Sequence, residues 1–263
     1  MDSGNTIAPT GTVVVRSSQG DFGITLPPPQ GLHYTHDATL ASRSLEAAEP
    51  QVPAAWMFTP ITTQGFARVV KRAMDLAGGV LGIVISSPLW LLAALAVKCD
   101  GQGNVLFRQV RVGKEGRPFN MLKFRTMCAD AEHRKADLAA HNQMTGPVFK
   151  MHNDPRVTRL GRLLRKYSVD ELPQLVNVVR GEMSLVGPRP ALPSEVNQYE
   201  AWQRQRLCVK PGLTCLWQVN GRNEVDFEEW MKLDLEYISR SSPGLDLVIL
   251  VKTVPAVLRG TGV

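Results

Sequence analysis

Paired cysteines are absent from this sequence, since none of its four cysteines stands in a CxxC pair. Cys99, Cys128, Cys208 and Cys215 therefore show neither a disulfide framework nor the spacing of zinc ligands. We expect a reduced, cytosolic chain in which each thiol is a small buried side chain. Basic heptads and basic motifs interleaved with aromatic residues are also missing, so the sequence gives no support for nucleic acid as a partner.

The first 30 residues lack a basic stretch followed by an apolar one, so we expect no cleavable signal peptide. Residues 1–65 hold seven prolines, six glycines and no sustained apolar period, which predicts a disordered or weakly ordered N-terminal tail. Two basic and five acidic residues give this tail a net charge of −3, whereas the 28 basic and 19 acidic residues that follow give +9. A positively charged body suits anionic lipid headgroups and phosphate-bearing substrates.

Charge is absent from the 22 residues between Leu76 and Val97. An apolar run of that length suffices for a membrane helix, which needs about 20 residues. Pro88 breaks or kinks a helix because it has no N–H, and the hydroxyls of Ser86 and Ser87 can bond the backbone groups that are freed there. Basic residues mark the cytoplasmic side of a membrane and here flank both ends of the run. This favours a re-entrant helix–break–helix that returns to the side it entered. A plain kinked anchor is the first alternative, and a buried helix of a soluble core is the second.

Two short strands are predicted within residues 105–127, and the turn-rich segment 113–118 joins them into a small β-hairpin. On the second strand, a period of two places Lys123 and Arg125 on one face and Phe124 and Thr126 on the other. These cations are either solvated or part of an anion site, and their spacing leaves both interpretations open.

Helices are predicted in two segments after the hairpin. Residues 130–141 are polar and rich in alanine, and residues 158–166 form a short helix with four basic residues along it.

The densest signal is YSVDELPQ at residues 167–174. Pro173 is tolerated only in the first turn of a helix, so Asp170 and Glu171 stand at a helix N-terminus, just after several arginines. Ser168 and Glu171 have the spacing of a capping box, which is one interpretation. The other is a carboxylate nucleophile beside a carboxylate that binds a divalent metal, where phosphate oxygens would bind.

Two later segments also suit a phosphate substrate at a membrane. Arg189 lies between two prolines, and such a rigid turn would order a guanidinium for bidentate contact with phosphate; a surface turn with a solvated arginine is equally open. Residues 245–258 place apolar side chains on one helix face, which predicts an interfacial helix bent at Pro255.

Six motifs occur in order between residues 66 and 263, and together they are far more specific than any one of them. They are KRxxD at 71–75, Ser87-Pro88, KFRTM at 123–127, DPRVTRLGRLLRKYSVDELPQ at 154–174, SLVGPRP at 184–190 and KPGLTCLWQVNGRN at 210–223. On these motifs the chain resembles the bacterial sugar transferases, the monotopic phosphoglycosyl transferases that begin exopolysaccharide, capsule or O-antigen assembly. Val169 stands where this family usually has leucine, which is a mild departure.

The resemblance implies a role for each matching residue. Asp170 would be the nucleophile and Glu171 the Mg²⁺ ligand, and both would be catalytic. Ser87 and Pro88 would form the break in the membrane helix. The residues that would bind phosphate or substrate are Lys123, Arg125, Thr126, Arg165 and Arg189.

The resemblance also implies a fold and a reaction. The fold would be α+β and mainly helical, with a re-entrant membrane helix at residues 66–100. Residues 101–263 would form a catalytic domain on the cytoplasmic face of the bacterial inner membrane, with interfacial helices around the site. The enzyme would transfer a hexose 1-phosphate from a UDP-sugar to polyprenyl (undecaprenyl) phosphate through phospho-Asp170 and release UMP. A homodimer is compatible with this scheme. A membrane-bound phosphohydrolase and a non-catalytic basic membrane scaffold are the alternatives.

Overall fold

The computed structural model describes residues 12–17, 20–25, 65–101, 103–135, 137–220 and 225–260. The chain divides into two units, residues 1–48 and 49–263. In the first unit, β1 (Thr12–Ser17) and β2 (Gly20–Thr25) pair as an antiparallel hairpin that the sequence analysis did not predict. The prediction of a weakly ordered tail otherwise concerns residues outside the described ranges.

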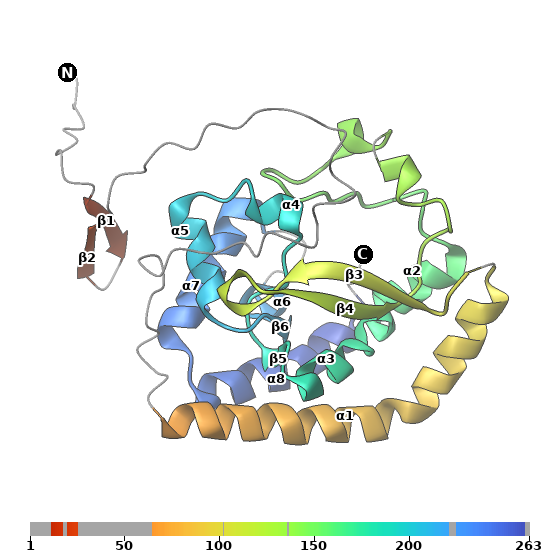
Figure 1. Ribbon diagram of the computed structural model, residues 1–263, viewed down its shortest axis with the longest axis horizontal. Helices are drawn as coiled ribbons and strands as arrows, with labels where there is room; N and C mark the ends of the chain where they lie inside the picture. The colour runs from red at the N-terminus through yellow and green to blue at the C-terminus, as the bar shows by residue number, and fades with distance from the viewer. Residues whose placement is uncertain are drawn as a thin grey trace. The chain divides into compact units, whose positions relative to one another are not determined.

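The second unit begins with α1 (Phe66–Cys99), a single helix of 34 residues. Figure 1 shows it as one continuous ribbon that bends along its length. The sequence analysis predicted two helices separated by a break, and the structure instead carries the helix through Pro88. The proline cannot donate to the carbonyl of Val84 one turn back, and the hydroxyl of Ser87 donates to it instead at 2.8 Å. Ser86 bonds the carbonyl of Gly82 in the same way. The side chains therefore keep the helix whole across the bend.

Among the described residues, α1 is the one helix long and apolar enough to cross a membrane, judged by length and composition. Most of its apolar side chains are exposed, including Val84, Ile85, Leu91 and Leu95. A water-soluble surface seldom carries so long an apolar face, which is consistent with a membrane-associated helix.

Two small sheets accompany the helices. β3 (Leu106–Val112) and β4 (Pro118–Phe124) form the antiparallel hairpin that the sequence analysis predicted. β5 (Ser184–Val186) and β6 (Gly212–Thr214) pair in parallel, and this sheet was not predicted, because strands of three residues are too short to show a period.

Short helices make up most of the remaining chain, so the α+β, mainly helical fold class is confirmed. The side chain of Thr158 caps the predicted short helix, accepting a hydrogen bond from the N–H of Gly161 at 2.9 Å. The helices are α2 (Arg159–Lys166), α3 (Gln174–Arg180), α4 (Pro193–Val196), α5 (Ala201–Arg204), α6 (Leu216–Val219), α7 (Phe227–Arg240) and α8 (Pro243–Leu258).

The helix predicted at residues 130–141 was wrong. The described residues of this segment, 130–135 and 137–141, form two single 3-10 turns, His133–Lys135 and Ala139–His141, and no α-helix. Ala131 is the one apolar side chain of this segment in the buried core as described. A helix of about 12 residues without an apolar face to bury is marginal in water, so alanine content alone did not stabilise it.

The first turns of α1 are fastened to the body by the KRxxD motif. Lys71 pairs with Asp246 of α8 at 2.6 Å, and Arg72 donates to two carbonyls in the last turn of α3. Asp75 is buried and accepts a hydrogen bond from the hydroxyl of Ser184 in β5 at 2.8 Å. These residues therefore hold α1, α3, β5 and α8 together.

The cysteines were predicted correctly in part. All four are free thiols; Cys208 and Cys215 are buried in the two main apolar clusters. Cys128 is half-buried, and Cys99 is exposed, contrary to the prediction that each thiol would be buried. Cys99 is the last residue of α1.

Candidate active site

A sharp turn between α2 and α3 presents the two acids of the YSVDELPQ segment. Ser168 adopts a left-handed conformation with φ of 54°, which reverses the chain after α2. Residues Val169–Glu171 then form one 3-10 turn, and Pro173 stands at the N-terminal boundary of α3. Ser168 makes no side-chain capping bond to this turn, so the capping box considered from the spacing is not formed. Glu171 is engaged elsewhere.

Lys123 of β4 bridges the two acids. Its ammonium lies 2.7 Å from Glu171 Oε1 and 4.0 Å from Asp170 Oδ2. Asp170 is only 5% exposed, and its burial, together with the charge of Glu171, raises the pKa of its carboxyl group, against the opposing charge of Lys123. Burial likewise lowers the pKa of Lys123, against the opposing charge of Glu171. The ammonium of Lys123 therefore contacts the carboxylates of both acids.

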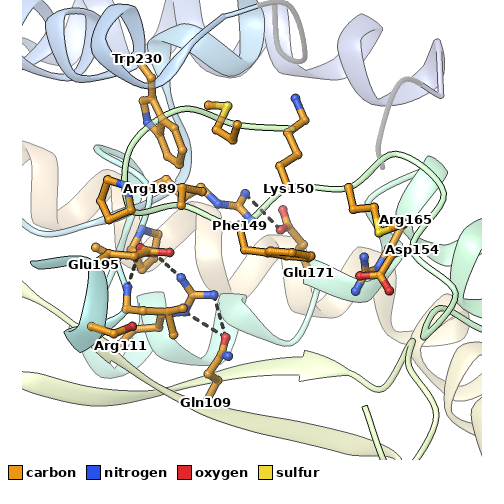
Figure 2. A pocket seen from close by; sticks show the side chains of 18 of the residues that line it. Gln109, Arg111, Phe149, Lys150, Asp154, Arg165, Glu171, Arg189, Glu195 and Trp230 are labelled. Carbon is orange, nitrogen blue, oxygen red and sulfur yellow. Dashed lines mark hydrogen bonds and ion pairs between the residues drawn. The ribbon is translucent and has the colours of Figure 1, made fainter. Parts of the chain in front are cut away.

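Two arginines complete the charged cluster. The guanidinium of Arg189 points toward Glu171, 3.6 Å from its Oε1, as the dashed line in Figure 2 shows. Arg165 of α2 donates from Nε to the hydroxyl of Thr126 at 3.0 Å, and its charge opposes the rise in the pKa of Asp170. Burial lowers the pKa of Arg165 itself. Lys123, Arg165, Arg189 and Thr126, all predicted site residues, thus gather around the predicted pair of acids.

Arg125 is not part of this cluster. Its guanidinium donates to the carbonyls of Val97 and Gly101, both at 2.9 Å, at the C-terminal end of α1. The strand β4 ends at Phe124, so the period of two that grouped Arg125 with Lys123 no longer applies one residue later. Ser87 and Pro88 lie within α1 and line no part of the pocket at the acids.

A pocket of about 400 Å³ opens in front of the acid pair. Its wall holds Asp170 and Glu171, and beyond them a set of residues that the sequence analysis did not assign to the site. Figure 2 shows several of them around the same space. They include Gln109, Arg111, Phe149, Lys150, Glu195, Arg206, Trp217 and Trp230. Arg111 stands in no quoted motif, and Trp217 lies in the motif at residues 210–223 without an assigned role. Trp230 carries no local signal, since it reaches the pocket through tertiary packing.

The side chains at this site can bind a divalent cation only together with oxygens of a ligand. Among the described residues no group of three or more His, Cys, Asp or Glu side chains could hold a metal ion. The adjacent carboxylates of Asp170 and Glu171 remain, and Mg²⁺ is commonly bound by one or two carboxylates together with phosphate oxygens of a substrate. The site therefore fits Mg²⁺ that arrives with a phosphate ligand, and does not provide a dedicated protein cage.

This arrangement has a definite chemical capability. The buried carboxylate of Asp170 lies beside that of Glu171, and Arg165 and Arg189 line the same pocket. Lys123 contacts both acids from β4, so the three cations exceed the two acids in charge. Such a site attracts a multiply charged anion, and its cations can stabilise charge that develops on phosphate oxygens during transfer.

Comparisons with known proteins agree with this chemistry. The family model of the bacterial sugar transferases matches residues 66–260. The chain is 46% identical over 195 residues to the galactosyl transferase CpsE of Streptococcus agalactiae, covering 74% of this chain and 43% of that protein. It is 41% identical over 199 residues to the exopolysaccharide production protein ExoY of Sinorhizobium fredii, covering 74% and 88%. It is 40% identical over 199 residues to the undecaprenyl-phosphate galactose phosphotransferase of Salmonella typhimurium, covering 74% and 42%. The chain thus spans less than half the length of two of these relatives and most of the third. From residue 66 to residue 260, it belongs to the bacterial sugar transferase family.

Proposed function

We propose that this protein transfers a hexose 1-phosphate from a UDP-sugar to polyprenyl phosphate and releases UMP. The observation that carries the proposal is the pair of buried Asp170 and half-buried Glu171, which Lys123 bridges and which lies with Arg165 and Arg189 at the wall of one pocket. The printed names of relatives include undecaprenyl-phosphate galactose and glucose phosphotransferases, which supports a hexose and a lipid phosphate as the two substrates.

Asp170 is the nucleophile in this scheme. Its carboxylate oxygen attacks the phosphorus next to the sugar, and the bond between that phosphorus and the bridging oxygen breaks. The bridging oxygen and its electron pair leave with UMP, and the sugar phosphate remains on Asp170 as an acyl phosphate. An oxygen of the lipid phosphate then attacks the same phosphorus and displaces the carboxylate, which regenerates Asp170 and gives polyprenyl-diphosphosugar.

The cations neutralise the substrate before the attack. A diphosphate would repel an ionised Asp170, and Lys123, Arg165 and Arg189 offset this repulsion within the pocket. Glu171, together with phosphate oxygens of the donor, would hold Mg²⁺, which supplies Lewis-acid polarisation of the phosphoryl group when bound. The ammonium of Lys123, 2.7 Å from Glu171 Oε1, holds this carboxylate in place for the role.

The membrane arrangement follows from where the exposed apolar side chains lie. α1 exposes a long apolar face, and α8 exposes Leu247, Val251, Val254 and Leu258 on the face that the sequence predicted to be interfacial. We assign α1 to a re-entrant position in the bacterial inner membrane and α8 to its cytoplasmic surface. This placement brings the pocket near the headgroups, where a lipid phosphate is available. The step would initiate exopolysaccharide, capsule or O-antigen assembly.

One experiment without lipid acceptor tests the mechanism. Purified protein is mixed with Mg²⁺ and a panel of UDP-hexoses, and UMP and the mass of the Asp170 peptide are followed with time. We expect about one UMP per active site and the added mass of one sugar phosphate, because a covalent intermediate forms before the acceptor binds. Continuous UMP release would identify a phosphohydrolase. Direct attack by the lipid phosphate would give no UMP until lipid is added, and a scaffold would release none in either case.

A further inference from the structure

The turn that carries Arg189 is held to the rest of the protein through its carbonyl groups. Arg189 stands between Pro188 and Pro190, and prolines have no N–H to donate. Each of the three consecutive carbonyls accepts one hydrogen bond from another part of the chain. Pro188 O accepts from the N–H of Gly212 at 2.8 Å, Arg189 O from Arg206 at 2.8 Å, and Pro190 O from Arg111 at 2.9 Å.

Arg206, which donates to the Arg189 carbonyl, lies in the core. It is 3% exposed, and its guanidinium donates to the hydroxyl of Tyr199 at 2.7 Å and to Asp234 at 2.6 Å, besides the carbonyl of Arg189. The rings of Tyr199 and Trp230 lie 5.7 and 5.6 Å from its central carbon. Asp234 balances its charge, and the planar fork of donors fixes its orientation. A buried arginine held this firmly gives the Arg189 carbonyl a rigid reference point.

Arg111 supports the next residue of the turn in a similar way. Its guanidinium donates to Gln109 through Nε at 3.0 Å and through a terminal nitrogen at 2.7 Å, and its other terminal nitrogen reaches the carbonyl of Pro190. Figure 2 shows Arg111 and Gln109 below the pocket, with Arg189 above them. Two arginines from different parts of the chain therefore hold successive carbonyls of one turn.

We propose that Arg206 is a positioning residue that aims Arg189 at the phosphates of the donor, acting through the main-chain carbonyl of Arg189. The inference rests on the proposed function, since it names what holds one of the phosphate-binding cations. Arg189 has a long side chain that is one-third exposed and contacts Glu171 only at 3.6 Å. These contacts orient the Arg189 side chain only weakly, so its orientation depends on where the main chain of the turn is held. A displacement of about 1 Å at such a residue can cost a hundred-fold in rate.

The first test is a cycle of two substitutions. Arg206→Lys keeps a charge beside Asp234, but one ammonium cannot reproduce the fork that reaches the tyrosine hydroxyl, the carboxylate and the Arg189 carbonyl together. We expect kcat/KM for the UDP-hexose to fall about ten-fold or more, with KM for the lipid phosphate unchanged. In an Arg189→Ala background, the same Arg206→Lys change should cost little more, because its effect passes through the missing side chain.

A matched control separates positioning from general stability. Arg72 also donates to two backbone carbonyls, far from the turn, at the end of α3. Arg72→Lys should lower the melting temperature as Arg206→Lys does, yet leave kcat/KM per folded molecule near the wild-type value. Tyr199→Phe removes one of the bonds that orient Arg206 and serves as the milder variant if Arg206→Lys does not fold. It should give a smaller loss of kcat/KM that likewise disappears in the Arg189→Ala background.

The outcomes are distinguishable from those of the proposed function. Binding of UDP, measured by calorimetry across the same cycle, gives a readout that does not depend on transfer. Losses that multiply in the double variant, or an Arg206→Lys protein with wild-type kinetics and UDP affinity, would overturn the positioning role alone. A wild-type protein that binds UDP but transfers nothing would overturn the proposed function, and the binding cycle would still decide the role of Arg206. A wild-type protein that neither transfers nor binds UDP would overturn both.

Discussion

Replacing Asp170 with asparagine should abolish transfer while making the folded protein no less stable. The amide of asparagine cannot form an acyl phosphate, so the loss falls on the chemical step itself. Removal of a nucleophile costs several orders of magnitude in rate, equivalent to about 5 kcal/mol or more of transition-state stabilisation. UMP release from a UDP-hexose in the presence of polyprenyl phosphate measures this loss.

The stability of the same variant follows from the burial of Asp170. Burial raises the pKa of this carboxyl group in the folded protein above its value in the unfolded chain. The folded state therefore binds the proton more tightly, and the stability contributed by the protonated group is lost as the pH rises through the raised pKa. Above that pKa the ionised carboxylate works against folding, and a neutral amide removes that cost. Lys123 keeps Glu171 as its nearer partner, at 2.7 Å. We expect a melting temperature equal to or above that of the wild type.

Asp75 provides the matched control, because it is buried to a similar extent, at 4% exposed against 5% for Asp170. Asp75 accepts hydrogen bonds from the hydroxyl of Ser184 and the N–H of Leu185. Asp75→Ala should lower the free energy of unfolding by about 1–3 kcal/mol, because the Ser184 hydroxyl and the Leu185 N–H both donate to Asp75 Oδ1 and would lose their shared acceptor. Its turnover per folded molecule should stay normal. A well-folded Asp170→Asn protein with near-normal turnover would refute the nucleophile, and a clearly lowered melting temperature would refute the argument from burial.

Three further predictions address the metal, the packing and the membrane. Glu171→Gln should weaken the response of transfer to added Mg²⁺, and full activity of the wild type in excess chelator would contradict a role for the metal. In Gly161→Ala the new methyl group would collide with the carbonyl of Thr126, so urea unfolding should show a loss of about 1–3 kcal/mol; an unchanged midpoint would contradict this close approach. With the other cysteines replaced, exposed Cys99 and a cysteine in place of Phe66 should both react with an impermeant label from the cytoplasmic side. Labelling of the two positions from opposite sides would mean that α1 spans the membrane.

The elements that could be predicted from the sequence are those whose turn residues, caps and apolar pattern favour the same structure as their packing in the fold. The β3–β4 hairpin has turn residues between two short apolar strands, and α2 has a threonine cap at its start. The position of Asp170 at a helix entry followed from Pro173 alone. The helix predicted at residues 130–141 does not form, because its helix propensity had no apolar face to support it. Arg125 lies apart from Lys123 and the acids, because β4 ends one residue before it.

The buried support of the site could not be predicted. Arg206 and Asp234 are separated by 28 residues, and no sequence pattern around either residue predicts their ion pair. Lys123 and Glu171 are separated by 48 residues, so their contact depends on how β4 packs against the turn before α3. Only the resemblance to a known family grouped them in advance. Single-sequence patterns describe what a segment does locally, whereas the charged cluster is assembled by tertiary packing.

The structure also changes the argument for the topology of α1. Cations that flank an apolar run usually mark the cytoplasmic side of a membrane. Two such cations here, Lys71 and Arg72, are committed to an ion pair and to backbone carbonyls within the protein, so they are poor markers of a membrane surface. Stronger support comes from what holds the two ends of the helix. Lys71 ties its first turns to α8, and Val97 near its end is buried against Phe124 of β4, with its carbonyl bonded by Arg125. Both ends are thus fastened to the same folded unit. A straight span would carry one of these contacts to the opposite side of the bilayer and expose its buried polar groups to lipid, at a cost of several kcal/mol for each unsatisfied group. The re-entrant arrangement keeps every one of these bonds.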